Sequence, residues 1–432
     1  MIDRRRCLAL TAAAVAVGAS GTVLAGPRRR SPRPSLRARV LVIGAGFAGS
    51  ACALRLRQLE PSIEVMLLDP VERYVTCPMS NEVIAGLREF SSLLVSDTGV
   101  RAAGIARVHE RALGLDASGT RVRLEHGRTL SFDRLVVAPG IRFLSDRIEG
   151  YDPAATRRMP HAWQAGEQTR LLAQQLRAMS DGGVVAICVP SGLMRCPPAP
   201  FERASLIASY LSQHKPRSKI LIFDGNNHFP RQDVFSAAWQ ALHPGMIEWI
   251  PSTEGGEVRR VDSASMTLYA GNGAHAVAVA NVIPPQAPAA LALDLGLASG
   301  HGWCPINPAS FQSTLLDHVH VIGDACIADA MPKSASAGVS QAQQCAAALV
   351  ALLSDRAIPA PAFDSVCYSH LSRDRAVSIP GQFGLRDGQI VSTAAPSTPE
   401  QVAAAAQPDT QATESQRAED WYRTIRGAAF GA

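Results

Sequence analysis

The fold of this chain is decided by residues 39–69, RVLVIGAGFAGSACALRLRQLEPSIEVMLLD. Residues 40–43 form a short, β-branched and apolar run, which predicts a buried strand. The run is followed at once by Gly44, Gly46 and Gly49, which fit the spacing G-x-G-x-x-G. The first glycine permits a tight turn, the second lets a pyrophosphate approach the backbone, and the third lets the next helix pack on the strand.

The residues after the glycines continue this unit. Residues 47–59 keep apolar side chains at helical spacing, and residues 64–68 predict a second strand. That strand ends on Asp69, twenty residues after Gly49, where a carboxylate can bind a ribose hydroxyl. A phosphate is expected at the helix N-terminus. A chance glycine turn in an α/β core is the alternative, but the strand, helix and acid together favour a dinucleotide site.

The N-terminus has the layout of an export signal. Three arginines at positions 4–6 precede an uncharged run over 7–26, which is rich in Ala and Gly and therefore a poor membrane span. Adjacent arginines favour the twin-arginine route and a periplasmic location; an uncleaved N-terminal anchor is the alternative. Residues 27–38 form a linker rich in Pro and Arg.

Composition argues against several classes of protein. The formal net charge is +5, and much of the positive charge lies in the signal and linker, so nothing indicates a nucleic-acid partner. No later apolar stretch is long enough for stable membrane insertion. The nine cysteines form neither a paired C-x-x-C metal motif nor a C-x-x-C-H haem attachment motif. We therefore expect no metal site and no haem on this chain.

Two later strands end in turns of the kind found in flavin-binding domains. The run LVVAPG at 135–140 predicts a buried strand that ends at Gly140, and VHVIGD at 319–324 delivers Asp324 into a turn. Between them lies a second α/β unit. The turn after its first strand, 184–189, contains four prolines and lacks the glycine fingerprint, so we expect this domain to have no NAD site.

The remaining segments predict a helix and two polar stretches. A long Ala-rich helix follows Lys333, and its N-terminus is expected to face a flavin pyrimidine and stabilise negative charge there; a solvated lysine is the alternative. Residues 226–235 are predicted to be polar and turn-like, and residues 393–414 a surface excursion. A short helix is expected over 421–430.

Unusual motifs cover nearly all of the chain after the signal. They are YVTCPMSNEV at 74–83, LVVAPG at 135–140, MPHAWQAGEQT at 159–169, RCPPAPFERAS at 195–205, VIPPQ at 282–286, GWCPIN at 302–307, HVIGDA at 320–325, MPKS at 331–334 and SVCYS at 365–369. Together with the glycine fingerprint, they resemble the flavoprotein subunit of flavocytochrome c sulfide dehydrogenase, a glutathione-reductase-like, FAD-dependent family.

The resemblance implies an α/β fold with two Rossmann-like dinucleotide-binding domains, the second without an NAD site, and a C-terminal α+β domain. The expected boundaries are an export signal at 1–26, a linker at 27–38, an FAD-binding domain at 39–150 and 285–360, an NAD-like domain at 151–284 and a C-terminal interface domain at 361–432.

The same resemblance implies the roles of individual residues. Cys77 matches the cysteine that carries FAD covalently through a thioether, and Cys196 and Cys367 match a pair that forms a redox disulfide beside the flavin. Glu202 matches an acid near that pair. The chain departs from the family pattern at Pro78, where an aromatic residue is typical, and in a shortened loop over 226–232. From the residues alone, a buried small hydrophobe is an equal alternative for Cys77. A structural staple is the alternative for the pair, but the redox role is favoured because Cys196 follows the strand end where the missing NAD turn would lie.

The implied activity is oxidation of sulfide to sulfane sulfur through the redox disulfide and FAD. Because this chain has no haem motif, a separate c-type cytochrome subunit would accept the electrons. Two alternatives remain. One is a sulfide:quinone reductase-like enzyme, and the other is an accessory flavoprotein that supports a sulfur-carrier, thiosulfate-oxidising complex. A pyridine-nucleotide disulfide reductase is disfavoured because both the NAD turn and its paired redox motif are missing.

Overall fold

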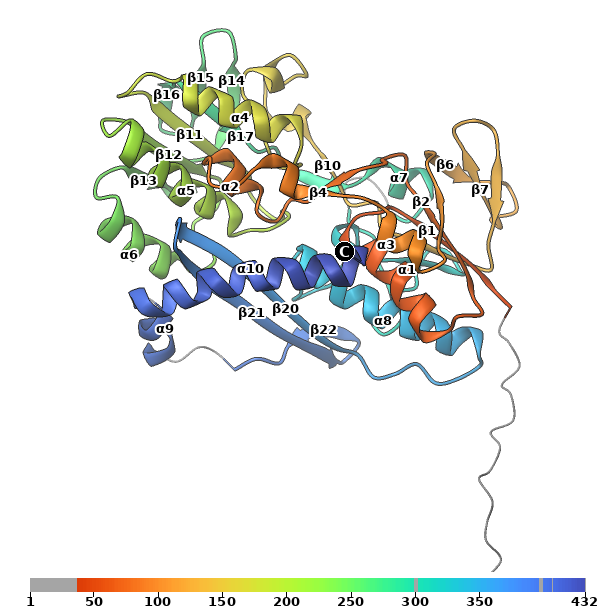
Figure 1. The fold of residues 1–432 in the computed structure, drawn as a ribbon. Helices are drawn as coiled ribbons and strands as arrows, with labels where there is room; N and C mark the ends of the chain where they lie inside the picture. Colours follow the sequence, from red (N-terminus) through yellow and green to blue (C-terminus); the bar gives the residue numbers. More distant parts are fainter. Residues whose placement is uncertain (1–36, 299–301, 396–398, 406, 432) are drawn as a thin grey trace, which may run out of the picture. The chain divides into compact units, whose positions relative to one another are not determined.

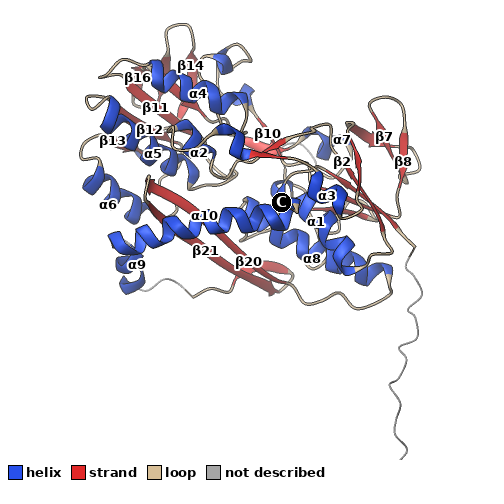
Figure 2. Cartoon of the chain, viewed as in Figure 1, coloured by secondary structure: helices blue, strands red, loops and turns tan. Residues whose placement is uncertain are grey.

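The computed structural model describes residues 37–298, 302–395, 399–405 and 407–431. The predicted export signal and most of the linker lie outside these residues. The described chain is α/β, with two parallel sheets of Rossmann type and a C-terminal part built from a third sheet and a long helix (Figures 1 and 2).

The first parallel sheet carries the glycine fingerprint. Its five strands lie in the order β19 (Val319–Val321), β9 (Arg134–Val137), β1 (Arg39–Ile43), β2 (Glu64–Leu68) and β5 (Ala106–Val108). The predicted strand 64–68 and the helix α1 (Phe47–Leu59) are confirmed. A parallel sheet is covered on both faces, which explains why the central strands are continuous apolar runs rather than alternating ones.

Several short elements lie between β2 and β9 along the chain. They are β3 (Tyr74–Val75), α2 (Ser80–Ile84), β4 (Leu94–Val95), α3 (Thr98–Ala102) and the antiparallel strands β6 (Ala112–Leu115), β7 (Arg121–Leu124) and β8 (Thr129–Ser131). Strand β10 (Ile141–Phe143) pairs with β18 (Gln286–Pro288), so the chain crosses between the two parallel sheets on a small antiparallel ribbon. Helix α7 (Ala290–Asp294) follows it.

The second parallel sheet has four strands. Their order is β13 (Ile247–Ile250), β12 (Lys219–Asp224), β11 (Val184–Val189) and β17 (Val279–Val282), with helices α4 (Glu167–Ala178), α5 (Ala199–His214) and α6 (Gln232–Leu242). A separate antiparallel sheet follows α6 and β13, made of β14 (Val258–Asp262), β15 (Thr267–Ala270) and β16 (Gly273–Ala276).

The prediction that residues 226–235 are polar and turn-like is wrong for the second half of that segment. Helix α6 begins there, and the side chains of Phe229, Val234 and Phe235 are buried. The Phe229 ring stacks on Phe201 of α5 with 3.6 Å between ring centroids. Asn, His, Pro and Arg hid this apolar spacing in the sequence.

The C-terminal part packs against helices α1, α3 and α8 of the first domain. Strands β20 (Ala362–Ser372), β21 (Arg375–Arg386) and β22 (Gln389–Ser392) form an antiparallel sheet, followed by α9 (Pro399–Ala405) and α10 (Pro408–Phe430). Figure 1 shows α10 lying along β20 and β21, with the C-terminus beside α1 and α3, and residue contacts join these elements. Helix α8 (Ala335–Leu353) packs on α1 and β20.

Helix α10 is much longer than the expected helix over 421–430. It starts inside the segment predicted to be a surface excursion, with Pro408 in its first turn. A stripe of buried side chains at helical spacing, Ala418, Tyr422, Ile425 and Ala429, faces the protein. In the first half of the helix the buried positions are the polar Gln411 and Glu414, so the sequence shows no apolar stripe there.

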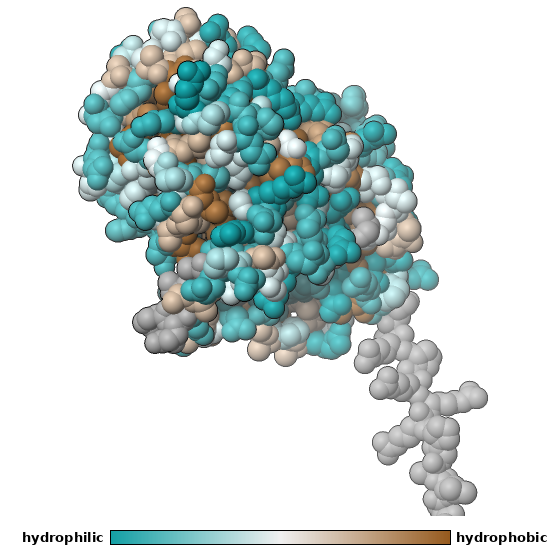
Figure 3. Space-filling model, turned by 60° about the vertical axis from the view of Figure 1, so that its left-hand side comes forward, coloured by the Kyte–Doolittle hydropathy of each residue, from teal (hydrophilic) through white to brown (hydrophobic). Residues whose placement is uncertain are grey.

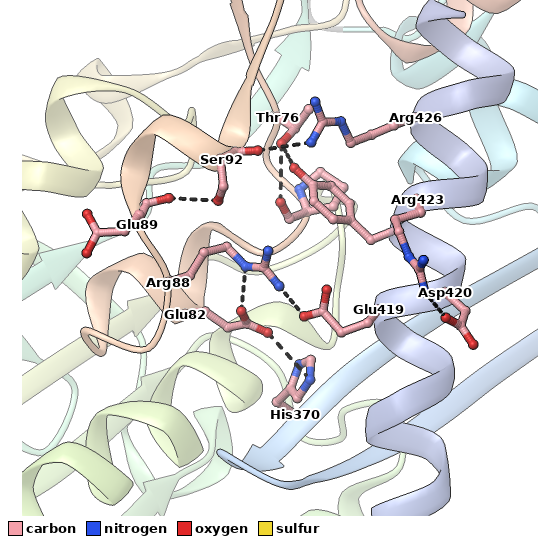
Figure 4. A network of polar contacts seen from close by, with 12 residues as sticks. Thr76, Glu82, Arg88, Glu89, Ser92, His370, Glu419, Asp420, Arg423 and Arg426 are labelled. Carbon is pink, nitrogen blue, oxygen red and sulfur yellow. Dashed lines mark hydrogen bonds and ion pairs between the residues drawn. The ribbon is translucent and has the colours of Figure 1, made fainter. Parts of the chain in front are cut away.

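A buried hydrogen bond fastens α10 to the loop before α2. The hydroxyls of Tyr422 and Thr76 lie 2.6 Å apart, and Thr76 is completely buried (Figure 4). We expect Tyr422→Phe to lower the free energy of unfolding by about 1 kcal/mol, the usual net value of one hydrogen bond. Urea unfolding followed by circular dichroism measures this. Tyr210→Phe on α5 is the matched control and should leave the stability unchanged; equal effects would show that the bond contributes nothing.

Candidate active site

A cavity of about 400 Å³ lies where the first sheet, α5, α8 and β20 come together. Residues from all three parts of the fold line this central cavity. Among them are the glycine turn after β1, the loop between β3 and α2, the turn before α5, the N-terminus of α8 and the middle of β20. Of the predicted site residues, all but Gly49 and Lys333 are in the lining: Gly44, Gly46, Asp69, Cys77, Gly140, Cys196, Glu202, Asp324 and Cys367.

The three glycines of the fingerprint serve different purposes. A Cβ on Gly44 would lie 2.2 Å from the Ala138 carbonyl oxygen, and a Cβ on Gly49 only 1.9 Å from the carbonyl oxygen of Gly44. Side chains at these two positions are therefore excluded by the fold itself. A Cβ on Gly46 would meet nothing closer than the Tyr74 hydroxyl at 3.6 Å. Gly46 thus keeps the cavity open at the N-terminus of α1, as a bound pyrophosphate requires.

Asp69 lies at the end of β2 and faces the same turn. Its carboxylate accepts hydrogen bonds from the backbone N–H groups of Ala45 and Val71, each at 2.8 Å. These bonds hold the carboxylate beside the glycine turn, where a ribose hydroxyl would donate to it. The open turn, the helix N-terminus and this fixed acid fit the adenosine and pyrophosphate half of FAD.

Lys333 does not line the central cavity. Its ammonium donates to the backbone carbonyls of Asp324 and Cys326, each at 2.9 Å, and lies 3.8 Å from the centroid of the Trp303 ring. Burial lowers the pKa of Lys333. The lysine therefore ties the loop before α8 to the turn after β19. The N-terminus of α8 itself does face the cavity, through Ser334, Ala335 and Ser336.

Three cysteines line the cavity from three separate parts of the chain. Cys77 follows β3, Cys196 precedes α5, and Cys367 lies in β20. None of the eight cysteines that the structure describes is in a disulfide. The backbone of Cys196 is in the left-handed region, with φ of 53°, and its N–H donates to the Lys333 carbonyl at 2.8 Å. Such strain in a non-glycine residue is typical of functional sites.

Electrostatics disfavour free thiolates at Cys196 and Cys367. Burial raises the pKa of Cys196 well above its usual value, with further contributions from Cys367 and Glu202, while Arg195 opposes the rise. Burial also raises the pKa of Cys367, against the Ser334 hydroxyl. The remaining cysteines Cys52, Cys188, Cys304, Cys326 and Cys345 are buried in the core.

Arg195 is a cavity residue that the sequence did not reveal. Its guanidinium lies 3.7 Å from the Asp324 carboxylate, and its side chain also hydrogen-bonds the Trp163 carbonyl. Burial opposes its charge, but Cys77 and Asp324 outweigh this and raise the pKa of Arg195. A permanent cation therefore stands among the cavity cysteines. Its place directly before Cys196 in the sequence is the one feature that could have indicated a role in the site.

Glu202 is held by two hydrogen bonds at the wall of the cavity. Its carboxylate accepts from the Asn81 side chain at 2.6 Å and from the backbone N–H of His370 at 3.0 Å. Asn81 is fixed in turn by Arg203, whose guanidinium is buried and donates to the Asn81 oxygen at 2.9 Å. Burial lowers the pKa of Arg203 to about 10. Sequence reasoning missed Asn81 and His370 because they meet Glu202 only in the folded chain. It missed Arg203, the neighbour of Glu202, because the bond of Arg203 to Asn81 also forms only there.

The aspartate at the end of the second strand is buried in the second parallel sheet, unlike Asp69 in the first. Asp224, at the end of β12, is fully buried and accepts hydrogen bonds from the Trp249 indole at 3.0 Å and the Asn226 backbone at 2.9 Å. Burial raises the pKa of Asp224. This carboxylate is occupied inside the protein, whereas Asp69 faces a cavity. The contrast agrees with the expectation that the second domain has no nicotinamide site.

Comparison with known families matches three parts of the chain. Residues 38–178 match the pyridine nucleotide-disulphide oxidoreductase family, residues 169–284 the central part of the sulfide dehydrogenase [flavocytochrome c] flavoprotein chain, and residues 359–430 the flavocytochrome c sulphide dehydrogenase flavin-binding family. The fold and the site thus define a flavin-dependent oxidoreductase that binds FAD.

Individual relatives narrow the class. The sulfide dehydrogenase [flavocytochrome c] flavoprotein chain of Chlorobaculum thiosulfatiphilum is 53% identical over 45 residues, which cover 10% of this chain and 94% of that sequence. The chain belongs to the family of flavocytochrome c sulfide dehydrogenase flavoprotein chains.

More distant relatives share the fold. The mouse mitochondrial sulfide:quinone oxidoreductase is 28% identical over 134 residues, and the match spans 30% of each chain. The solved structure of sulfide:quinone oxidoreductase from Aquifex aeolicus superposes with a TM-score of 0.68 at 16% identity, covering 91% of this chain and 93% of that one.

The different roles of Gly46 and Gly49 give a paired prediction. Gly49→Ala should destabilise the fold by about 2–3 kcal/mol, because its Cβ would overlap the Gly44 carbonyl. Gly46→Ala should fold with nearly wild-type stability but lose most of its FAD, because its Cβ fills the pyrophosphate position. Thermal unfolding and the flavin-to-protein absorbance ratio separate the two effects. Normal FAD content in Gly46→Ala would contradict the assigned pyrophosphate site.

Proposed function

We propose that this chain is a periplasmic sulfide dehydrogenase flavoprotein. It oxidises sulfide to sulfane sulfur through a Cys196–Cys367 disulfide and FAD, and it passes the electrons to a c-type cytochrome subunit. The observation that carries the proposal is the meeting of these two cysteines and Cys77 with the glycine turn in one cavity. The export signal in the sequence supports the periplasmic location, and the family membership supports the substrate and the cytochrome partner.

The residues present fit bound FAD along the length of the cavity. The glycine turn and the start of α1 would hold the pyrophosphate, and Asp69 would hold a ribose hydroxyl. Cys77 would carry the flavin covalently, and the N-terminus of α8 would stabilise negative charge near it. When bound, FAD supplies a two-electron acceptor that can release electrons singly to a haem.

The chemistry of the cysteine pair begins with the oxidised, disulfide form. Hydrosulfide attacks one sulfur, a new S–S bond forms, and the Cys196–Cys367 bond breaks. The products are a cysteine persulfide and the thiolate of the other cysteine. The negative charge that HS⁻ brings in is then carried by this thiolate. Because burial disfavours a thiolate at either position, the released thiolate is a strong electron donor. Arg195 offsets part of that charge at Cys196.

A quinone is the second candidate electron acceptor. The mouse and Aquifex relatives are named as sulfide:quinone oxidoreductases. Among the described residues, no helix combines the length and apolar character needed to cross a membrane. On the face drawn in Figure 3, hydrophilic side chains predominate and apolar ones lie in separate groups. The matches of residues 169–284 and 359–430 to flavocytochrome c sulfide dehydrogenase families favour the cytochrome. An accessory role beside a sulfur-carrier complex is the alternative to a turnover enzyme.

Anaerobic sulfide titration tests the proposed activity. We expect sulfide, but not NADH, to bleach the flavin absorbance of the wild type, and oxidised cytochrome c to restore it faster than a soluble quinone does. Cys196→Ser should bind FAD normally and resist bleaching by sulfide, since no disulfide can form. Cys188→Ala, a buried cysteine outside the cavity, is the control and should bleach like the wild type. Bleaching of Cys196→Ser at the wild-type rate would refute the disulfide role.

The role of Cys77 is tested on denatured protein. If Cys77 carries FAD through a thioether, flavin stays with the unfolded wild-type chain and is released from Cys77→Ala. Absorbance of the polypeptide after acid precipitation measures this, with Cys188→Ala as the control that should retain flavin. Release of flavin from the wild type would show that Cys77 holds FAD without a covalent bond.

A further inference from the structure

A row of ionisable side chains joins the central cavity to a second pocket, which is lined by residues of α2, β20 and α10. This outer pocket has a volume of about 700 Å³. Its lining includes Glu82, Arg88, His370, Arg373, Asp374 and Glu419. Glu202 lines the central cavity, whereas Glu82 and His370 line the outer pocket. Glu202 on the wall of the central cavity and Glu82 on the wall of the outer pocket are therefore separated by His370.

The imidazole of His370 stands between two carboxylates. Its Nδ1 lies 3.4 Å from Glu202 Oε1. Its Nε2 lies 3.5 Å from Glu82 Oε1, and Figure 4 shows this second contact. These are ion-pair separations, slightly longer than hydrogen bonds, and Nδ1 has no hydrogen-bond partner among the described residues. A small rotation of the ring brings either nitrogen to a carboxylate.

The outer carboxylate is connected further. Glu82 accepts from the Arg88 guanidinium at 2.6 Å, and Arg88 also pairs with Glu419 of α10 (Figure 4). The side chains of His370, Glu82 and Glu202 are 4%, 10% and 14% exposed, so exposure increases on both sides of the ring. The row thus leads from one solvent-accessible space to another through a nearly dry centre.

The proposed reaction requires a route for protons. Oxidation of HS⁻ to sulfane sulfur yields two electrons and one proton. The electrons leave through the flavin to the one-electron acceptor, but the proton must reach bulk water. An uncompensated proton in a buried, partly apolar cavity is costly, and each turnover would add another.

We propose that Glu202, His370 and Glu82 form a proton relay from the cysteine pair to the outer pocket. The inference rests on the proposed function, since it concerns the proton of the sulfide substrate. Glu202 accepts the proton from sulfur, His370 takes it at Nδ1 and gives one up from Nε2 to Glu82, and Glu82 releases it to water. Each group carries the same number of protons before and after the transfer, and the imidazole regains its starting tautomer by exchange with water before the next turnover, so the balance is one proton out for each HS⁻ oxidised.

The charges around His370 suit this task. Burial alone would lower the pKa of its imidazole, but Glu202, Glu82 and Glu419 together raise it. Burial raises the pKa of Glu82, while His370 and Arg88 oppose the rise. The pKa of each group is thus raised above its usual value by the contacts and burial that define the row. His370 acts through Glu202 and does not itself line the cavity of the cysteines.

A purely structural cluster would also bring these groups together, since they join α2, α5, α10 and β20. Chemical rescue distinguishes the two roles. Imidazole added to a His370→Ala variant can diffuse into the outer pocket and replace the missing ring as a proton carrier. Free imidazole is not attached to β20, so it does not restore a role in which the His370 ring only holds the neighbouring elements together.

The experiment uses stopped-flow reduction of the FAD-loaded protein by sulfide under anaerobic conditions. In His370→Ala, we expect reduction to slow about 10- to 100-fold, with a larger solvent deuterium isotope effect than in the wild type, and imidazole to restore the rate. Reduction by dithionite should be unchanged, because it requires no proton from sulfide. His243→Ala, which removes another buried histidine that hydrogen-bonds Ser212, is the control and should show neither slowing nor rescue.

Other outcomes overturn the relay. His370→Ala that reacts with sulfide at the wild-type rate, or that is slowed without any rescue by imidazole, would refute it. Should His370→Ala fail to fold, Glu82→Gln provides the second test and should show the same slowing and isotope effect. A wild type that sulfide does not reduce would refute the proposed function as well, whereas a sulfide-reducible wild type with an unaffected His370→Ala would refute the relay alone.

Discussion

The close contact between Gly49 and the carbonyl of Gly44 is the constraint on which the rest of the site depends. The first turn of α1 presses against the turn after β1 so tightly that even a methyl group is excluded. The same turn of α1 meets α8 and the turn after β19 through small residues, because a Cβ on Gly323 or Gly338 would lie 3.1 or 3.3 Å from the Ala48 Cβ. These contacts fix the two helix N-termini that face the central cavity.

The cavity combines groups that are costly to bury separately. Burial disfavours the charged, thiolate form of Cys196, and it also disfavours the charge of Arg195. Placed together, the cation and the sulfur atoms compensate each other, and Asp324 completes the balance. In the proposed reaction, such a site would favour the disulfide at rest and make the released thiolate a strong electron donor.

The C-terminal sheet and α10 are part of the site as well as its cover. Strand β20 contributes Cys367 to the central cavity and His370 to the outer pocket. Helix α10 brings Glu419 to the outer pocket and holds the loop of Cys77 through the Tyr422–Thr76 bond. Loop, strand and helix therefore position Cys77, Cys367 and His370 jointly.

The sequence by itself determined the local units: the strand, glycine turn and helix of residues 39–59, the acid at Asp69, and the cysteines whose motifs resemble one family. Such units depend on neighbouring residues and on periodicity, which a sequence displays directly. It did not reveal the length of α10 or the helix after residue 231, because polar residues masked their buried stripes. Only the tertiary structure decided that Arg195, Asn81, His370 and Glu82 surround the cysteines and Glu202. Their contacts join residues more than a hundred positions apart, and the electrostatic effect of one charge on another depends on distance in space rather than on separation along the chain.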